Sequence, residues 1–324
     1  MFNMNKFYLL LSAFQKSIRW CEVNASRYFA QQLMDMGMPG AVFNRLILIA
    51  AEDVGLADPS LVIYERQCSD SFEKLIKQYK IKKRDAVKFP SLCEIVDRAV
   101  IAAATSYKSR LLPQLNFATL YDIYQHEDFS KDLSEYLSQF VAALKKGDEQ
   151  QATYYAYLVD ILSNSADQIL TMIQRLSGMR NKDLIEKWVQ EYKRNYERLM
   201  LTGSIVLLCR DLNYKYGEYN GAISQHLSVP VTKANIPDRA YDMHTGVGKR
   251  KGRGFEHFFN VAATVKNERF PNDWEKAGRS AYIHANQKGL GKAAKIIEAI
   301  KKKHEKFKES QKSERIYSSA SVCL

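Results

Sequence analysis

The sequence predicts a mainly α-helical protein, and three observations support this. Apolar residues recur at helical spacing through most of the first 213 residues. Glycine and proline fall between the periodic segments, where they end helices. Apolar residues make up 46% of the 324-residue chain, which is ample for a core in one large or two ordinary domains.

Residues 5–125 are expected to form four or five helices. Their breaks are Gly37/Pro39/Gly40, Gly55/Asp58/Pro59, the charged run Lys80–Arg84, Pro90 and Pro113.

Residues 128–213 contain two apolar stripes at helical spacing, which we interpret as packing between helices or subunits. The first comprises Tyr154, Leu158, Ile161, Ile169, Met172, Ile173 and Leu176, and the second Trp188, Tyr192, Tyr196 and Leu199. The break at Ser177-Gly178 predicts an antiparallel helical hairpin.

After Asn213 the chain becomes irregular, and prolines at 230, 237 and 271 prevent long helices until Trp274. A last helix is expected near Leu290–Ser310, followed by a polar, disordered tail. The predicted divisions are therefore a helical domain at 1–126, a hairpin extension at 127–213, a basic region at 214–309 and a tail at 310–324.

Glu52 and Asp53 stand just before Gly55, at the predicted end of a helix. The helix dipole disfavours carboxylates there, so they are expected to have a cationic partner. Arg19 is the candidate for a structural ion pair with both, and a functional acid is the alternative reading.

The residues around these positions resemble a known family. The segments are Ser12-Ala13-Phe14-Gln15-Lys16-Ser17-Ile18-Arg19 and the run from Arg45 to Pro59, Arg-Leu-Ile-Leu-Ile-Ala-Ala-Glu-Asp-Val-Gly-Leu-Ala-Asp-Pro. They resemble the RarA/MgsA replication-associated recombination ATPases, in the part that follows the ATPase core. Asn24–Phe29 and Ala102–Arg110 are recognisable variants of further family segments. In contrast, Gly37–Gly40 departs from the family's Gly-x-Asp-Pro turn, and residues 127–220 match no part of it.

The resemblance implies a helical collar, related to clamp-loader collars, through which subunits assemble into tetramers. It also implies action at stalled replication forks and on DNA held by single-strand-binding protein. The expected partners are therefore DNA (single-stranded or forked), further copies of the chain, and single-strand-binding protein or a separate ATPase.

The sequence has no complete phosphate-binding loop of the form Gly-x-x-x-x-Gly-Lys-(Ser/Thr). The nearest segments, Gly246–Arg250 and Gly289–Ala293, lack the hydroxyl that binds magnesium. Met1 also leaves no room for an ATPase core ahead of the family segments. We therefore expect no cofactor, no catalytic residue, and neither binding nor hydrolysis of ATP.

Five scattered cysteines and six dispersed histidines lack the spacings of metal sites or of a disulfide framework. No metal site is expected. No apolar run is long enough to span a bilayer, and no leader or prenylation motif is recognised. We expect a cytoplasmic, nucleoid-associated protein.

The net charge of +12 is concentrated near the C-terminus: residues 231–324 hold 20 Lys/Arg against 10 Asp/Glu. Such a surface is typical of proteins that bind a polyanion. Four cations lie among glycines that let a backbone follow phosphates, and three lysines on the last helix are expected to assist. The predicted nucleic-acid-binding residues are Lys249, Arg250, Lys251, Arg253, Lys301, Lys302 and Lys303.

Two other functions stay open at this stage. Asp242 and His244 could transfer protons in an enzyme that processes nucleic acid or nucleotide phosphates. Alternatively, the chain could be a protein-binding scaffold whose basic tail meets an acidic partner.

Overall fold

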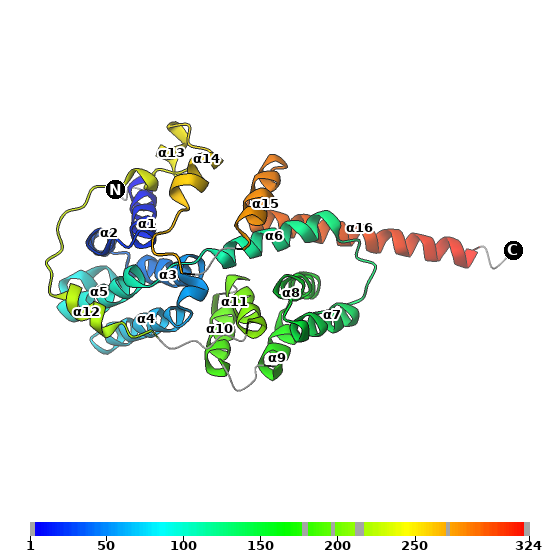
Figure 1. Cartoon of the computed structure of the whole chain (residues 1–324), viewed down its shortest axis with the longest axis horizontal. Helices are drawn as coiled ribbons and strands as arrows, with labels where there is room; N and C mark the ends of the chain where they lie inside the picture. The colour runs from blue at the N-terminus through cyan, green and yellow to red at the C-terminus, as the bar shows by residue number, and fades with distance from the viewer. Residues whose placement is uncertain (1–3, 177–180, 196–197, 211–216, 270–272, 321–324) are drawn as a thin grey trace. The chain divides into compact units, whose positions relative to one another are not determined.

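The computed structural model describes residues 4–176, 181–195, 198–210, 217–269 and 273–320 (Figure 1). Over these ranges the chain is helical, with no β-strand and one isolated bridge between Lys108 and Glu268. The predicted all-α class is therefore confirmed. None of the described helices is both long and apolar enough to cross a membrane.

The chain divides into two compact units, each built from two separated stretches. The first unit joins residues 1–112 to residues 214–272, and the second joins residues 113–213 to residues 273–324. This division differs from the predicted one, because the 214–309 region is shared between the units. The reason is tertiary packing, because residues 217–269 pack against the helices of residues 1–112.

The first unit consists of helices and short helical turns. They are α1 (Met4–Arg19), α2 (Val23–Asp35), α3 (Pro39–Ile49), η1 (Ala50–Val54), η2 (Gly55–Ala57), α4 (Leu61–Gln78), η3 (Lys83–Lys88), α5 (Pro90–Thr105), α12 (Asn220–Leu227), η4 (Asp238–Ala240), α13 (Gly246–Arg250), α14 (Phe255–His257) and η5 (Phe258–Ala262).

The core of the first unit lies among helices α1 to α5. The alanine-rich part of α5, residues 99–104, is completely buried, because small side chains let neighbouring helices approach closely. Phe14 and Ile18 of α1 are also fully buried. These two side chains pack the C-terminal half of α1 against the core.

The second unit begins within α6 (Leu111–His126), from Pro113 onward. Its other helices are α7 (Leu133–Lys146), α8 (Glu149–Ser163), α9 (Asp167–Leu176), α10 (Lys182–Asn195), α11 (Arg198–Cys209), α15 (Glu275–Gln287) and α16 (Ala293–Ala320). Gly147, at φ +71°, ends α7, and Asp148 caps α8.

The described residues of 127–213 form five helices, α7 to α11, rather than the two of the predicted hairpin. The apolar stripes pack mainly inside the unit: Trp188 is fully buried, and Tyr192 is 5% exposed and donates a hydrogen bond to Asp160. They therefore give no support to subunit contacts through this region. Tyr196 and the break at Ser177-Gly178 lie outside the described residues.

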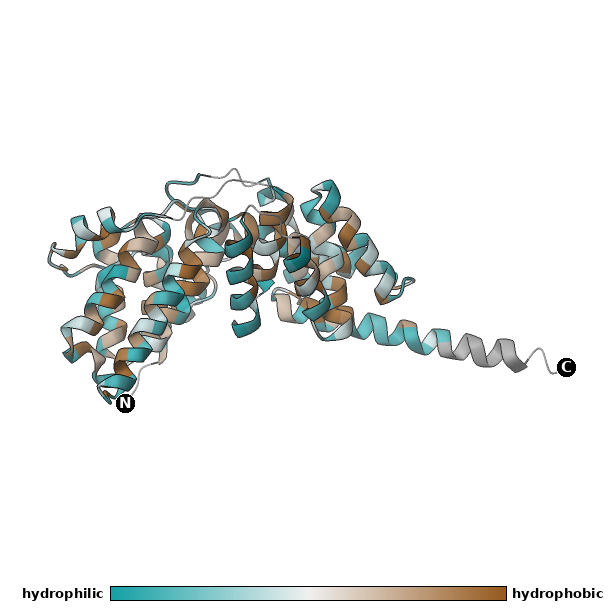
Figure 2. Ribbon diagram, turned by 90° about the horizontal axis from the view of Figure 1, so that it is seen from below, coloured by the Kyte–Doolittle hydropathy of each residue, from teal (hydrophilic) through white to brown (hydrophobic). Residues whose placement is uncertain are grey.

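The tail was also mispredicted, because α16 continues to Ala320 rather than ending near Ser310. Residues 310–320 contain no proline or glycine that would end the helix. In Figure 2, the coloured part of α16 is mostly hydrophilic beyond its first turns.

Candidate functional site

Helix α1 places a stripe of polar side chains in the interior of the first unit. Ser12, Gln15, Lys16 and Arg19 are spaced three and four apart, so they share one face of the helix. The last three are at most 6% exposed. We call these four residues the α1 polar stripe.

Arg19 binds both predicted carboxylates. Its Nε lies 2.7 Å from Asp53 Oδ1, and its Nη2 lies 3.2 Å from Glu52 Oε1. Burial alone would lower the pKa of Arg19, but the two carboxylates outweigh it and raise the pKa above its usual value. The guanidinium therefore stays charged inside the protein.

A second arginine at this site was not foreseen from the sequence. Arg110 Nη1 lies 2.9 Å from Asp53 Oδ1, and its Nη2 lies 3.3 Å from Glu52 Oε1. Burial opposes ionisation of Asp53, yet Arg19 and Arg110 hold its pKa below the usual range. The signal available was the position of Arg110 at the end of a segment that resembles the family.

Gln15 and Arg45 complete the hydrogen bonding. The Gln15 amide donates to Asp53 Oδ2 at 3.0 Å and to Glu52 Oε2 at 3.2 Å, and Arg45 Nη1 donates to Gln15 Oε1 at 3.1 Å. Asp53 is fully buried, so the hydrogen bond from Gln15 helps to compensate its lost hydration, and Arg45 holds Gln15 in place.

Two π-helical turns supply the groups that Arg19 contacts. Glu52 and Asp53 lie in η1, and Arg19 Nη1 donates at 2.8 Å to the carbonyl of Ala262, the last residue of η5. A π-turn adds one residue to a helical turn and so redirects the side chains around it. Arg19 thus links η1 and η5, two π-helical turns that are more than 200 residues apart in sequence.

Lys16 makes the second buried ion pair of the stripe. Its Nζ lies 2.6 Å from Oδ2 of Asp242, whose side chain is fully buried. Ser12 Oγ donates to the Ala240 carbonyl at 2.7 Å. Burial opposes ionisation of Asp242, but the His244 hydrogen bond and Lys16 hold its pKa well below the usual range. The stripe therefore anchors the segment that precedes the predicted DNA-binding residues.

The glycine-containing segment with the four predicted cations is partly helical, since residues 246–250 form α13. The Thr245 hydroxyl accepts a hydrogen bond from the Gly248 amide at 3.0 Å and caps its N-terminus. Gly248 has no room for a side chain, because a Cβ there would lie 1.9 Å from the Asp242 carbonyl oxygen. The short helix is thus held against the anchored segment.

The four predicted cations of this segment are not equivalent. Lys249, Arg250 and Lys251 are exposed, and the Lys251 ammonium lies 4.6 Å from the centre of the Tyr241 ring. Arg253 instead donates to the carbonyls of Asp238 and Tyr241, at 2.5 and 2.8 Å, and to the Asp238 carboxylate. Its guanidinium therefore holds residue 253 against residues 238–241.

Lys301, Lys302 and Lys303 lie on α16 in the second unit, so they share no compact unit with α13. Lys301 donates to Asn164, Lys302 pairs with Glu298 at 2.8 Å, and Lys303 donates to the carbonyl of Tyr124. The structure therefore brings only three predicted cations together as exposed groups, on and beside α13.

Asp242 is placed to support the fold rather than to move protons. Its side chain is inaccessible and bound to Lys16, and its Oδ1 accepts from the His244 amide at 3.0 Å. The described residues also contain no group of three or more His, Cys, Asp or Glu side chains that could hold a metal ion.

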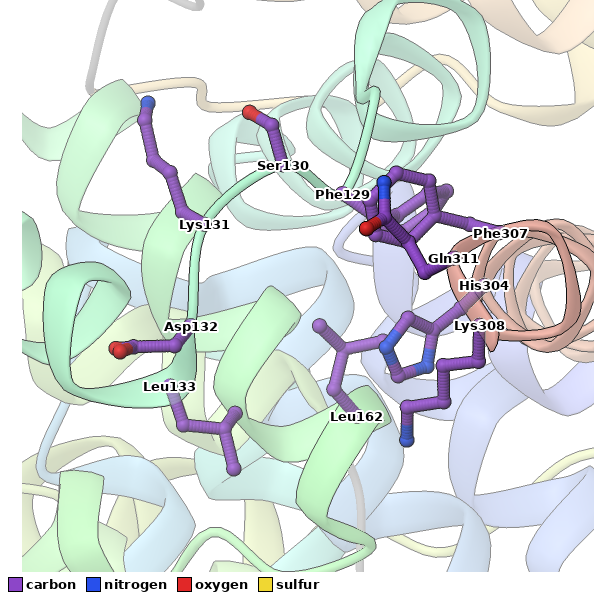
Figure 3. Close-up of a pocket in the computed structure, with 10 residues that line it drawn as sticks. All are labelled: Phe129, Ser130, Lys131, Asp132, Leu133, Leu162, His304, Phe307, Lys308 and Gln311. Atoms are coloured by element: carbon purple, nitrogen blue, oxygen red, sulfur yellow. The ribbon is translucent and has the colours of Figure 1, made fainter. Parts of the chain in front are cut away.

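The second unit contains a pocket of about 720 Å³ beside α16 (Figure 3). Phe129, Leu133 and Leu162 form apolar walls, while His304 and Phe307 face them from α16. Asp132 is used as the N-cap of α7, so its carboxylate is committed to that helix.

Comparison with known proteins identifies one segment of the first unit. Residues 21–78 match the family described as MgsA AAA+ ATPase C terminal. The match includes Arg45, Glu52 and Asp53, whereas α1 and Arg110 lie outside it. The predicted resemblance is therefore confirmed for this segment.

Two curated relatives are both called Replication-associated recombination protein A. The protein of Bacillus subtilis (strain 168) is 46% identical over 52 residues, which are 16% of this chain and 12% of that protein. The protein of Coxiella burnetii is 37% identical over 70 residues, or 21% and 16% of the two chains. Each match thus spans less than a fifth of the relative's length. No solved structure matches this chain significantly.

Proposed function

We propose that this chain is a non-catalytic, DNA-associated protein of replication and recombination, which binds phosphates through Lys249, Arg250 and Lys251. One observation supports this most directly. The segment that presents these exposed cations is anchored by the buried Lys16–Asp242 ion pair to the α1 polar stripe. The same stripe binds the carboxylates of the segment that matches the family.

Anchoring matters because phosphate contacts are worth more when the cations are already in place. Ordering a long, flexible side chain or a loop costs conformational entropy, which reduces the net gain from each contact. The capped helix α13 and the Arg253 contacts reduce that cost for the backbone.

We extend the proposal to self-association and to recruitment of replication proteins, on the resemblance alone. Sedimentation of the pure protein at tens of micromolar, with and without a forked oligonucleotide, tests self-association. A species near 37 kDa without DNA, and no more than one protein chain per oligonucleotide with it, would contradict self-association. We also propose that the chain does not turn over ATP, and magnesium-dependent ATP hydrolysis by clean protein would contradict that.

A salt titration with a matched control tests the DNA site. The variant Lys249→Ala/Arg250→Ala/Lys251→Ala removes three exposed cations on and beside α13. The control Lys80→Ala/Lys82→Ala/Arg84→Ala removes three exposed cations elsewhere in the same unit. Both variants lose the same net charge, so only the location differs.

Each phosphate contact contributes about 0.7–0.9 to the slope of log affinity against log salt. The slope should therefore fall by roughly two to three in the α13 variant and stay unchanged in the control. Equal losses in both would indicate a diffuse charge effect. No binding by the wild type at low salt would favour a scaffold that meets an acidic protein partner.

A further inference from the structure

Three helices of the second unit bring aromatic rings and lysines to one surface. Phe117, Tyr121 and Tyr124 are spaced four and three apart on α6, so they share a face of about 10 Å in length. From α15 and its C-terminal end come His284 and Lys288, and from α16 comes Lys303. We call these six residues the α6 aromatic face.

The rings contact one another across α6 and α15. Tyr121 and Tyr124 have ring centres 6.1 Å apart, and the His284 ring lies 6.4 Å from Tyr121 with planes only 14° from parallel. Phe117 contacts Tyr282 of α15 at 4.8 Å. His284 is exposed, and the two tyrosines are half-buried.

Ammonium groups lie over these rings. Lys288 Nζ lies 5.9 Å from the centre of Tyr121 and 5.7 Å from that of Tyr124, and Lys303 Nζ lies 4.7 Å from Tyr124. Lys288 also donates to Gln125 at 3.3 Å, and Lys303 to the Tyr124 carbonyl. Both lysines are exposed at the surface. The tyrosine rings are thus flanked by cations.

The chain around His284 and Lys288 carries only positive charge, whereas Glu298 and Glu305 lie on α16 with Lys303. Residues 276–297 contain five Lys/Arg and no Asp/Glu. On α6, Asp122 lies 2.8 Å from His126 Nδ1, so its carboxylate already has a partner. A ligand at this surface would therefore meet aromatic rings beside a predominantly positive field.

We propose that the α6 aromatic face binds single-stranded nucleic acid, with bases stacking on Tyr121 and Tyr124 and with Lys288 and Lys303 meeting the phosphates. A single strand has unpaired bases, which can stack on the tyrosine rings, and a phosphate backbone, which can contact the lysines. Duplex DNA would present only its phosphates, since its bases are already stacked. The proposal rests on the DNA-associated function proposed above and adds a second site, on the other unit.

The test uses the full chain and fluorescently labelled strands of about 16 nucleotides, the upper end of common site sizes. The probes are oligothymidine, oligouridine, a duplex, and an abasic strand with the same phosphates. The variant Tyr121→Ala/Tyr124→Ala removes both rings, and Tyr121→Phe/Tyr124→Phe is the matched control that keeps them. Oligothymidine and oligouridine distinguish DNA from RNA as the preferred strand.

Wild type and the Phe variant should bind a base-bearing strand more tightly than the abasic strand. The Ala variant should bind it roughly 5-fold to 150-fold more weakly for each ring that stacks, and should lose the preference over the abasic strand. The variant Lys249→Ala/Arg250→Ala/Lys251→Ala should keep that preference, because its cations lie in the other unit.

Photocross-linking of an iodouridine-containing strand to the wild type gives a readout that does not depend on any variant folding. The cross-links should fall in residues 117–126 or 280–288. Unchanged binding by a folded Ala variant, or cross-links confined to other segments, would overturn the proposal. Wild type that binds duplex and abasic strands as well as base-bearing ones would overturn it while leaving the α13 proposal intact. Wild type that binds no nucleic acid would overturn both.

Discussion

Lys16 and Asp242 form a buried ion pair, 2.6 Å between Nζ and Oδ2, across 226 residues of sequence. The pair joins the segment around Asp242 to helix α1. The His244 ring lies farther from Asp242, with 3.6 Å between Nδ1 and Oδ2. The position of the proposed DNA-binding cations therefore depends on this ion pair.

Removing one member of this pair should be costly. Lys16→Ala leaves Asp242 buried without its counter-charge, and we expect a loss of about 3–5 kcal/mol in the free energy of unfolding. The double variant Lys16→Met/Asp242→Leu should recover part of that loss, because no charge is then left unpaired. Urea unfolding measures both, and Lys302→Ala, which breaks an exposed pair, should change little. Equal stability of wild type and Lys16→Ala would contradict the prediction.

Replacing Gly248 should disturb the docking of α13. A Cβ at Gly248 would lie 1.9 Å from the Asp242 carbonyl, so Gly248→Ala should cost roughly 1–3 kcal/mol through overpacking. Gly246→Ala is the matched control, because its nearest neighbour is 3.7 Å away at the end of the Arg250 side chain. Thermal unfolding and the rate of tryptic cleavage after Lys249 should separate the two variants. If both behave alike, α13 is not packed as described.

Arg253→Ala should lower the stability of the protein without changing the salt dependence of DNA binding. Arg253 holds the carbonyls of Asp238 and Tyr241, so its loss should destabilise the segment by about 1–3 kcal/mol. The salt dependence of DNA binding should stay close to that of the wild type in protein that remains folded, because its donors are occupied by the protein. A slope reduced by nearly one would show that Arg253 contacts a phosphate after all.

We expect the buried Glu65 to make the free energy of unfolding depend on pH near neutrality. Its carboxyl group is fully buried, neither oxygen has a hydrogen-bond partner in the described structure, and burial raises its pKa well above the usual 4.5. The pKa of Glu65 is higher in the folded than in the unfolded state. The contribution of the neutral Glu65 side chain to the free energy of unfolding is therefore fully present below pH 4.5. That contribution is lost progressively as the pH rises toward the folded-state pKa.

The variant Glu65→Gln should remove this loss. The free energy of unfolding of the wild type should fall between pH 5 and 8 relative to the variant, by at most about 1.4 kcal/mol per pH unit. Glu94→Gln, at an exposed position on α5, is the control and should not alter the profile. Parallel pH profiles for wild type and Glu65→Gln would show that Glu65 ionises freely in the folded protein.

The sequence predicted four or five helices in residues 5–125, where the structure has six α-helices, and its predictions for the residues that follow were poorer. Glycine and proline mark several helix ends there, and the periodic segments lie one after another in the chain. Between 127 and 213 the same periodicity was present, but it could not say which apolar faces meet. Trp188 packs on Gly203 within the second unit, where a Cβ would come within 2.0 Å of the indole ring, and no local signal predicts that contact.

The all-α class, the basic C-terminal region and the need for a cation near Glu52 and Asp53 could be predicted from the sequence. These depend on periodicity, composition and the helix dipole, which are properties of neighbouring residues. Tertiary packing, in contrast, determines that Arg110 shares those carboxylates, that Lys16 binds Asp242, and that Arg253 is a structural residue. It also decided that Tyr121, Tyr124, Lys288 and Lys303 form one surface. Each of these contacts joins separate elements, so it exists only once packing has chosen which helices lie together.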